Sequence, residues 1–534
     1  MPLFVLFKND LSRRYGVLSL SLILSACTVL GPDYEAPVVP QLPSAWSESE
    51  MLAESEKLGR WWETFNDPIL TALIERGAQQ NLSIEAAGLR IVQARSALGI
   101  SDALIFPQQQ QLNGNLSPVY RNENWYKSFG ASFDVAWEMD VWGKYARGIE
   151  SAEASLYASI ASFHDVVVSV SAEIARNYIN YRTAEERKYL SRRNIAIQKR
   201  VVDMTQVKFD AGNVSELDVQ QAKTQLYATQ SALPGLSIAQ FQARNALAVL
   251  LGTLPQELEI LLGPEVVREA RVSQAGERFG GQLRESVTVS TYSKDSVIPA
   301  APELTVLPSS ELVLRRPDLQ VAELLMHAQS ARIGLAETEL YPQFFLFGSL
   351  GLSQTVRDNQ SFSFSDSVTA AIGPGISWNI FQYDRIKNQI RIEDARFQES
   401  LTAYNQSVLQ AVAEVTNAID TYRETIKKGQ YEFRGVQASI RAFSISATQY
   451  NNGLVTYQRL LSTVEKMTLR EDAYAQTRGN MAQQMVALYK ALGGGWQGLN
   501  RSPLKPATAD QMKARTDWGD YLMPGVIEGG DRSD

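Results

Sequence analysis

The sequence is short of the residues that build disulfides and metal sites. It contains one cysteine and two histidines in 534 residues. A disulfide within one chain is therefore excluded, and a zinc site of Cys and His ligands is out of reach. The formal net charge is −7, whereas a nucleic-acid-binding protein usually carries a basic stripe. These shortages argue against a metalloprotein and a nucleic-acid binder.

Motifs of enzyme chemistry are missing as well. The sequence has no nucleophile elbow, no Walker loop and no cluster of His, Asp and Glu. His164 and His327 lie in different helical stretches, which favours packed or solvated side chains over a metal ligand or a base. The run Gly493-Gly494-Gly495 lacks a following Lys-Ser/Thr, so it indicates the end of a helix. We therefore expect no enzyme activity, metal or cofactor beyond a covalent lipid.

That lipid is predicted from the N-terminus. Basic residues (Lys8, Arg13 and Arg14) precede a short apolar run that ends at Leu24, and the small residues Ser25 and Ala26 stand directly before Cys27. This pattern is typical of a bacterial export signal, and its last four residues resemble a lipobox. The resemblance implies cleavage after residue 26 and a diacylglyceryl group on Cys27. The alternative is an ordinary signal peptide followed by a free or buried cysteine.

Long apolar runs are absent from the rest of the chain. No segment after the N-terminal one is long and apolar enough to predict a transmembrane helix. If the protein spans a membrane, it must therefore do so with closed β-structure, because every backbone polar group must be paired inside lipid.

An internal repeat organises the chain. From residue 137 to 252 the sequence matches a second copy 241 residues later without a gap, and upstream the offset is 235. The predicted units are a signal peptide (1–26), an extended lipidated segment (27–66), repeat 1 (67–252), an equatorial connection (253–308), repeat 2 (309–496) and a tail (497–534). The pairs that fix the register are Trp137 with Trp378, Gly212 with Gly453, Gly252 with Gly493 and, at 235, Pro107 with Pro342.

Each repeat predicts the same order of elements, which makes the fold mainly α with a β-portion. A helix comes first (68–104 and 319–340), followed by strand-like sequence (129–137, 343–353 and 368–378) between polar loops (120–127 and 357–367). Segments of about ten residues suit tilted membrane strands, although an ordinary soluble hairpin remains the alternative. Very long helices follow, since residues 149–211, 377–428 and 436–452 contain neither Gly nor Pro. Pro234 predicts a kink or break in the return helix of repeat 1.

These features resemble the TolC-type outer-membrane efflux family, in its lipoprotein (NodT-like) branch that serves resistance-nodulation-division pumps. The motifs that carry the resemblance are Gly31-Pro32-Asp33-Tyr34, Trp61-Trp62-Glu63-Thr64-Phe65-Asn66-Asp67-Pro68, Leu314-Arg315-Arg316-Pro317-Asp318 and Leu247-Ala248-Val249-Leu250-Leu251-Gly252.

The resemblance implies a homotrimer in the outer membrane of a Gram-negative bacterium. Each subunit would give four strands to one twelve-stranded barrel and long helices to a periplasmic tube. The assembly would be the exit duct of a tripartite efflux system for drugs or other toxic small molecules, with a membrane-fusion adaptor and an inner-membrane pump as partners. Two alternatives remain: the outlet of a type I-like protein secretion system, and a periplasmic coiled-coil adaptor without a pore.

The resemblance also implies a periplasmic gate near the tip of the second helical hairpin. With the turn expected at Lys427-Lys428-Gly429, the helix before it carries polar residues three apart, and in a trimer each would form a ring of three. The candidates are Glu414, Asn417, Asp420 and Arg423, with Tyr404 further upstream. The alternative is a solvated helix face with ordinary pairs at i,i+3 and i,i+4.

Overall fold

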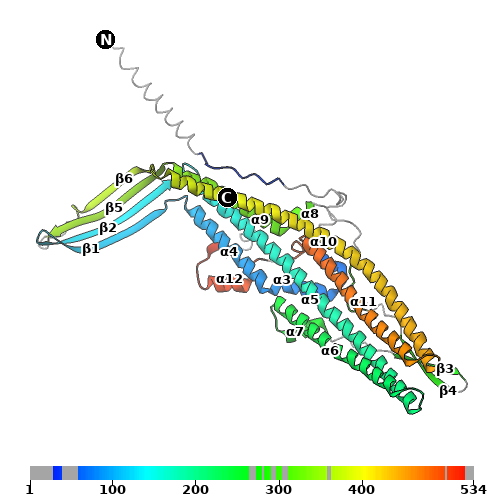
Figure 1. Ribbon diagram of the computed structural model, residues 1–534. Helices are drawn as coiled ribbons and strands as arrows, with labels where there is room; N and C mark the ends of the chain where they lie inside the picture. Colours follow the sequence, from blue (N-terminus) through cyan, green and yellow to red (C-terminus); the bar gives the residue numbers. More distant parts are fainter. Residues whose placement is uncertain are drawn as a thin grey trace, which may run out of the picture.

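The computed structural model is elongated, with a β-sheet at one end and long helices running away from it (Figure 1). It describes residues 28–38, 58–263, 272–279, 282–289, 296–302, 311–357, 363–499 and 502–522. The signal peptide and Cys27 lie outside these residues, as do the end of the tail and parts of the connection.

Four antiparallel strands form the sheet, in the order β1-β2-β5-β6. They are β1 (Gln109–Arg121), β2 (Asn124–Met139), β5 (Gln343–Arg357) and β6 (Val368–Ser377). The predicted polar loop at 120–127 is wrong, because β1 and β2 pair as far as Arg121 and Asn124. Only Asn122 and Glu123 form the turn, both with positive φ, as a two-residue hairpin turn requires.

Two uninterrupted helices run most of the length of the molecule, α5 (Lys144–Asp210) and α10 (Tyr383–Asn451). Shorter helices lie beside them in pairs: α4 (Leu82–Ala103) and α9 (Pro317–Glu337) on the sheet side, and α6 (Glu216–Leu250) and α11 (Tyr457–Ala491) on the far side. Below the middle, α5 packs against α6 and α11, and α10 packs against α11; above it, α5 contacts α4 and α9. The four shorter helices therefore form two columns of two helices each: α4 is continued by α6, and α9 is continued by α11.

The position of the second helical turn corrects the sequence prediction. Helix α10 does not end near Lys427-Lys428-Gly429 but continues to Asn451, and the turn lies at Gly453. Gly429 is buried, and a Cβ there would lie 3.1 Å from the Met481 sulfur of α11. The glycine therefore permits close helix packing, and sequence alone does not distinguish this use from a turn.

Pro234 does not break its helix either, because α6 is continuous from Glu216 to Leu250. Its ring lies on an exposed part of the helix, where water can satisfy the carbonyl group that loses its amide partner. The helix expected over 68–104 begins at Pro68 as predicted but is interrupted at Asn81, between α3 (Pro68–Gln80) and α4. Asp67 accepts hydrogen bonds from the amides of Ile69 (2.9 Å) and Leu70 (3.1 Å) at the start of α3.

The connection and the tail pack around the middle of the helices. The amide of Val297 donates to Glu186 (3.3 Å), and the hydroxyl of Tyr422 donates to the Pro302 carbonyl oxygen. The connection also contains elements that the sequence did not predict. The remaining elements are η1 (Trp61–Phe65), α7 (Pro255–Leu262), β3 (Val272–Phe279), β4 (Gln282–Val289), α8 (Glu311–Leu314), η2 (Thr338–Leu340), α12 (Pro506–Lys513) and η3 (Gly519–Leu522).

The main hydrophobic core joins both repeats to the N-terminal and C-terminal segments. Trp61 stacks on Tyr489 of α11 with ring centroids 5.3 Å apart, and both belong to or border the same buried cluster as Leu504 of the tail. The expectation that no helix is apolar enough to cross a membrane is wrong by length and composition, because one stretch within α5 passes that test among the described residues; 56% of that stretch is buried inside the chain. Such burial is what a core helix of the bundle shows.

Candidate functional site

The two faces of the four-stranded sheet differ in polarity. Residues directly opposite one another on neighbouring strands point to the same face, so the register Leu112↔Phe133↔Leu350 defines one of them. On that face most side chains are apolar, and they are exposed or half-buried, with Leu112 83% and Ile372 82% exposed. Its members include Leu112, Leu116, Tyr120, Trp125, Phe129, Phe133, Val135, Leu346, Leu350, Leu352, Val368, Ile372 and Ile376.

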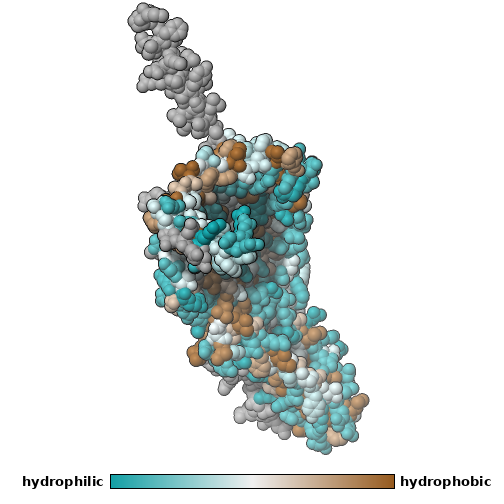
Figure 2. Space-filling view, turned by 90° about the vertical axis from the view of Figure 1, so that its left-hand side faces the viewer, coloured by the Kyte–Doolittle hydropathy of each residue, from teal (hydrophilic) through white to brown (hydrophobic). Residues whose placement is uncertain are grey.

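The opposite face is mainly polar. Asp134 lies near its centre and accepts hydrogen bonds from Asn113 of β1 (2.8 Å), Ser132 (2.8 Å) and Ser349 of β5 (2.5 Å). In Figure 2 the sheet end faces the viewer: brown side chains lie along its upper rim, and teal ones surround the hollow below. A sheet that is apolar outside and polar inside over all four strands is the pattern of a membrane barrel wall around a water-filled lumen.

The repeat recurs where the strands meet the helices. The indole N–H of Trp137 donates to the Ile105 carbonyl oxygen (2.8 Å), and that of Trp378 donates to the Leu340 carbonyl oxygen (3.0 Å). Donors and acceptors in the two copies correspond at the offsets of 241 and 235. The register found in the sequence therefore predicts a contact that ties each strand pair to the helix before it.

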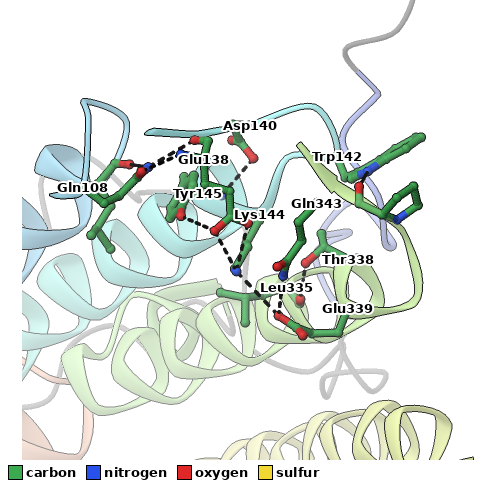
Figure 3. Close-up of polar contacts among 12 residues, drawn as sticks. Gln108, Glu138, Asp140, Trp142, Lys144, Tyr145, Leu335, Thr338, Glu339 and Gln343 are labelled. Carbon is green, nitrogen blue, oxygen red and sulfur yellow. Dashed lines mark hydrogen bonds and ion pairs between the residues drawn. The ribbon is translucent and has the colours of Figure 1, made fainter. Parts of the chain in front are cut away.

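A polar network fills this junction (Figure 3). The Lys144 ammonium lies 3.1 Å from a carboxylate oxygen of Glu138 on β2 and 3.6 Å from Glu339. The Tyr145 hydroxyl donates to Glu138 (2.8 Å), and Asp140 accepts from two amides of the first turn of α5. These bonds hold the sheet at a fixed angle to the helices.

An N-terminal strap, residues 28–38, lies across the same junction. Arg147 of α5 is buried and donates to the carbonyl oxygens of Leu30 (2.9 Å) and Gly31 (3.1 Å) and to Asp33 (2.9 Å). Gly31 has a φ of +88°, and a Cβ there would lie 2.2 Å from the Cα of Gly334. Gly31 of the strap and Gly334 of α9 are thus two sides of one close backbone contact.

Two equivalent contacts join the upper and lower helix of each column. They lie at the equator, the level at which the two helices of a column meet. Asn81, whose amide caps α4 through the Ile84 amide (3.0 Å), donates to the Leu250 carbonyl oxygen at the end of α6 (2.8 Å). Arg316, before α9, donates to the Ala491 carbonyl oxygen at the end of α11 (2.9 Å). Residues 81 and 316 correspond at the offset of 235, so the repeat could have revealed this pair.

The five gate candidates do not lie at the tip of the second hairpin. Asp420 precedes the turn by about 30 residues of continuous helix, or roughly 50 Å. Tyr404 is only 4% exposed within the main core, so its side chain is packed inside the subunit. Glu414 pairs with Arg316 (2.8 Å). Asn417 lines a groove of about 650 Å³, and Asp420 and Arg423 are exposed.

The hairpin tips lie at corresponding places in the two repeats. Gly212 and Gly453 both have positive φ, and new helices begin directly after Ser215 and Thr456. Ser215 and Asp218 form a capping box. Thr456 makes no side-chain cap bond. The Lys208 ammonium lies 4.0 Å from the Tyr450 ring centroid and joins the two hairpins.

The two histidines have packing roles. His327 stacks on Tyr34 of the strap with ring centroids 4.1 Å apart, and its Nε2 lies 3.1 Å from Glu150. His164 stacks on Trp496 with centroids 4.2 Å apart. No group of three or more His, Cys, Asp or Glu residues that could hold a metal occurs in the part of the chain that the structure describes.

Burial of His164 predicts an acid-sensitive step. Burial lowers the pKa of its imidazole to about 4, against about 6.5 in the unfolded chain. As pH falls from about 6.5 to 4 the unfolded state gains a proton that the folded state lacks, so stability falls by about 3 kcal/mol. The variant His164→Phe keeps an aromatic ring on Trp496. As the pH falls from about 6.5 to 4, the thermal unfolding midpoint of the wild type should drop relative to that of the variant; parallel profiles would contradict this.

Comparisons with known proteins agree with this architecture. The model of a family described as outer membrane efflux protein matches residues 73–253 and 309–494. Nodulation protein T of Rhizobium leguminosarum bv. trifolii is 25% identical, with 92% of this chain and 99% of the relative covered. The pyoverdine export outer membrane protein OpmQ of Pseudomonas putida is 27% identical, over 91% and 98%.

Solved structures show the same fold. The outer-membrane channel OprN superposes with a TM-score of 0.74 and 27% identity, covering 88% of this chain and 99% of that one. The Campylobacter jejuni CmeC outer membrane channel superposes with a TM-score of 0.71 and 19% identity, covering 91% and 98%.

Proposed function

This chain belongs to the outer membrane efflux protein family, and from that premise we propose that three copies close one barrel and form the exit duct of a tripartite efflux system. The observation that carries the proposal is the sheet with one apolar and one polar face. In the order β1-β2-β5-β6, strands β1 and β6 each have an edge that no other described strand pairs. Open edges are not tolerated in lipid, so a partner sheet must cover them.

A twelve-stranded barrel follows if three such sheets join edge to edge. The test is purification in mild detergent, followed by measurement of mass and of conductance in planar bilayers. We expect a trimer that conducts, because the polar faces of three sheets enclose water. A stable monomer, or a trimer without conductance, would disprove the duct.

The cargo is proposed to be small toxic molecules, delivered by a periplasmic adaptor and an inner-membrane pump. Relatives of this chain are named for export of pyoverdine, of toluene and of cations, so the duct fold serves chemically different small molecules. Deleting the gene should raise susceptibility to such compounds and leave secreted proteins unchanged. Loss of a secreted protein with unchanged susceptibility would favour the secretion outlet.

A lipid on Cys27 is proposed as an auxiliary anchor. The strap that follows it from Thr28 is fixed to the junction between sheet and helices by Arg147, and its Leu30 amide donates to the Trp142 carbonyl oxygen just after β2. Because the sheet itself spans the membrane, Cys27→Ser behind an ordinary signal peptide should still yield trimers in the outer membrane. Mass spectrometry of the N-terminus checks the lipid. Complete loss of trimer in the variant would show that the lipid is required for assembly.

The narrowest part of the duct is proposed to lie at the second hairpin tip rather than at Asp420. Among the residues exposed there are Leu454 at the turn and Arg459 in the first turn of α11. In the proposed trimer, the three copies of Leu454 and the three copies of Arg459 would approach one another at the threefold axis if the helical tube is closed at this end. Asn417, Asp420 and Arg423 would then be rings further along the duct.

A further inference from the structure

The polar face of the sheet carries two phenylalanines. Phe347 of β5 lies opposite Ala136, two residues from Asp134 on β2. Side chains two residues apart on a strand point to the same face, so Phe347 and, two residues before it, Phe345 share the face of Asp134. Phe347 is 41% exposed. In a wall that otherwise presents polar groups to water, neither core packing nor contact with lipid explains these rings.

Glycines of the neighbouring strand hold both rings against the wall. Phe345 lies opposite Gly375 of β6, and Phe347 lies opposite Gly373. A Cβ on Gly375 would overlap the Phe345 ring, and a Cβ on Gly373 would lie 3.5 Å from the Phe347 ring. An aromatic ring placed over a strand glycine covers backbone that would otherwise be exposed. The two rings therefore form an apolar strip on the polar face.

A carboxylate without a counter-ion lies beside this strip. Asp134 lies opposite Ser349, the next residue of β5 on this face after Phe347. Such diagonal neighbours on adjacent strands are about 7–8 Å apart, within reach of an aromatic side chain. The three side chains that donate hydrogen bonds to Asp134 are all uncharged, and no ion pair among the described residues includes it.

Other charges on the face do not neutralise Asp134. Glu138, nearer the helices, is paired with Lys144, whose ammonium lies 3.1 Å from it. The arginine of β5 is Arg357, eight residues beyond Ser349, or about 27 Å along the strand. A cation in the lumen therefore meets an unneutralised carboxylate at Asp134, with an aromatic ring beside it.

We propose that Asp134 and Phe347 form a binding site for organic cations that carry apolar groups. The carboxylate attracts the positive centre. The ring attracts the same centre through its π-face and contacts the apolar groups, which inorganic cations lack. The inference rests on the proposed duct, whose wall would carry three such sites in contact with passing cargo. Each site is complete within one subunit, because its residues all lie in one sheet.

Two substitutions separate the carboxylate from the ring. Asp134→Asn removes the charge and keeps a side chain that accepts hydrogen bonds, and Phe347→Leu removes the ring and keeps an apolar side chain. Phe133→Leu is the matched control, because Phe133 is next to Asp134 in β2 but lies on the apolar face. The full-length trimer in deuterated detergent is titrated with benzyltriethylammonium, and binding is followed by saturation-transfer NMR. Benzenesulfonate, an aromatic anion, is the control probe.

We expect Asp134→Asn and Phe347→Leu each to weaken binding of benzyltriethylammonium roughly twofold to fivefold, the range of an exposed cation–π contact or ion pair. Phe133→Leu should match the wild type. The preference for potassium over chloride, measured as a reversal potential in planar bilayers, should change in Asp134→Asn alone.

Unchanged binding in Phe347→Leu would reveal a ring of charge without an aromatic site and would overturn the inference. Equal binding of benzenesulfonate to the wild type would overturn it as well. A wild-type trimer that does not conduct would instead refute the duct, and the NMR titration would still test the site.

Discussion

Replacing Leu350 with arginine is expected to keep the protein out of the outer membrane. Leu350 lies on the apolar face near the middle of β5, between Phe133 and Ala370 of the neighbouring strands. An arginine facing lipid at the membrane midplane costs about 2–4 kcal/mol per chain, and a trimer would carry three of them, or roughly 6–12 kcal/mol in total. Heat-modifiable trimer in the outer-membrane fraction should fall to a trace.

Ser353→Arg on the same strand is the matched control. Ser353 lies opposite Gly130, on the polar face, where an added cation remains in water. This variant should insert normally and change only conductance and ion preference. If Leu350→Arg inserted as well as Ser353→Arg, the assignment of the two faces would be wrong.

The second large effect is expected at a buried ion pair in the helical region. Glu471 of α11 is fully buried and accepts hydrogen bonds from Arg193 and from Asn194 (3.2 Å), both on α5. Glu471→Ala leaves the Arg193 guanidinium, itself 7% exposed, without its counter-charge. Breaking such a pair typically costs about 3–5 kcal/mol, so the helical circular dichroism signal should melt at a clearly lower temperature.

Two further variants test the cause of that loss. Glu424→Ala removes an exposed carboxylate whose partner Lys427 is also exposed, and its effect should stay below about 1 kcal/mol. The double variant Arg193→Met with Glu471→Leu removes both charges and should recover most of the stability. A double variant as unstable as Glu471→Ala would show that lost packing, rather than the orphaned charge, is responsible.

The sequence predicted those parts of the fold that rest on the repeat and on local signals. The offset of 241 correctly paired Trp137 with Trp378 and Gly212 with Gly453. The two indoles make equivalent hydrogen bonds, and the two glycines have the same positive φ at a turn. The long helices were visible as runs free of Gly and Pro. The strand at 343–353 was visible as a strand-like segment of about ten residues before a polar loop.

The errors arose where one residue type serves two purposes. Gly429 indicated a turn, but its missing side chain makes room for Met481. Glu414 indicated a pore ring, but its partner Arg316 is almost 100 residues away in the sequence. Charges such as Arg193 and Glu471, on helices far apart in the chain, give no local sign that they are buried together. Only the packing of α5 against α11 reveals them.

The two-piece columns have a consequence for how this protein can change. At the equator one of the shorter helices ends and the next helix of the same column begins. The chain can therefore leave the layer of helices at this level and return to it without opening a gap in that layer. The connection after α6, the segment before α3 and the tail after α11 all leave the helices at this level. Insertions in these three segments lengthen the chain that packs around the outside of the helices and leave the number of helices in the layer unchanged. The equator is thus the place where members of such a lineage can acquire new binding segments at little risk to the duct.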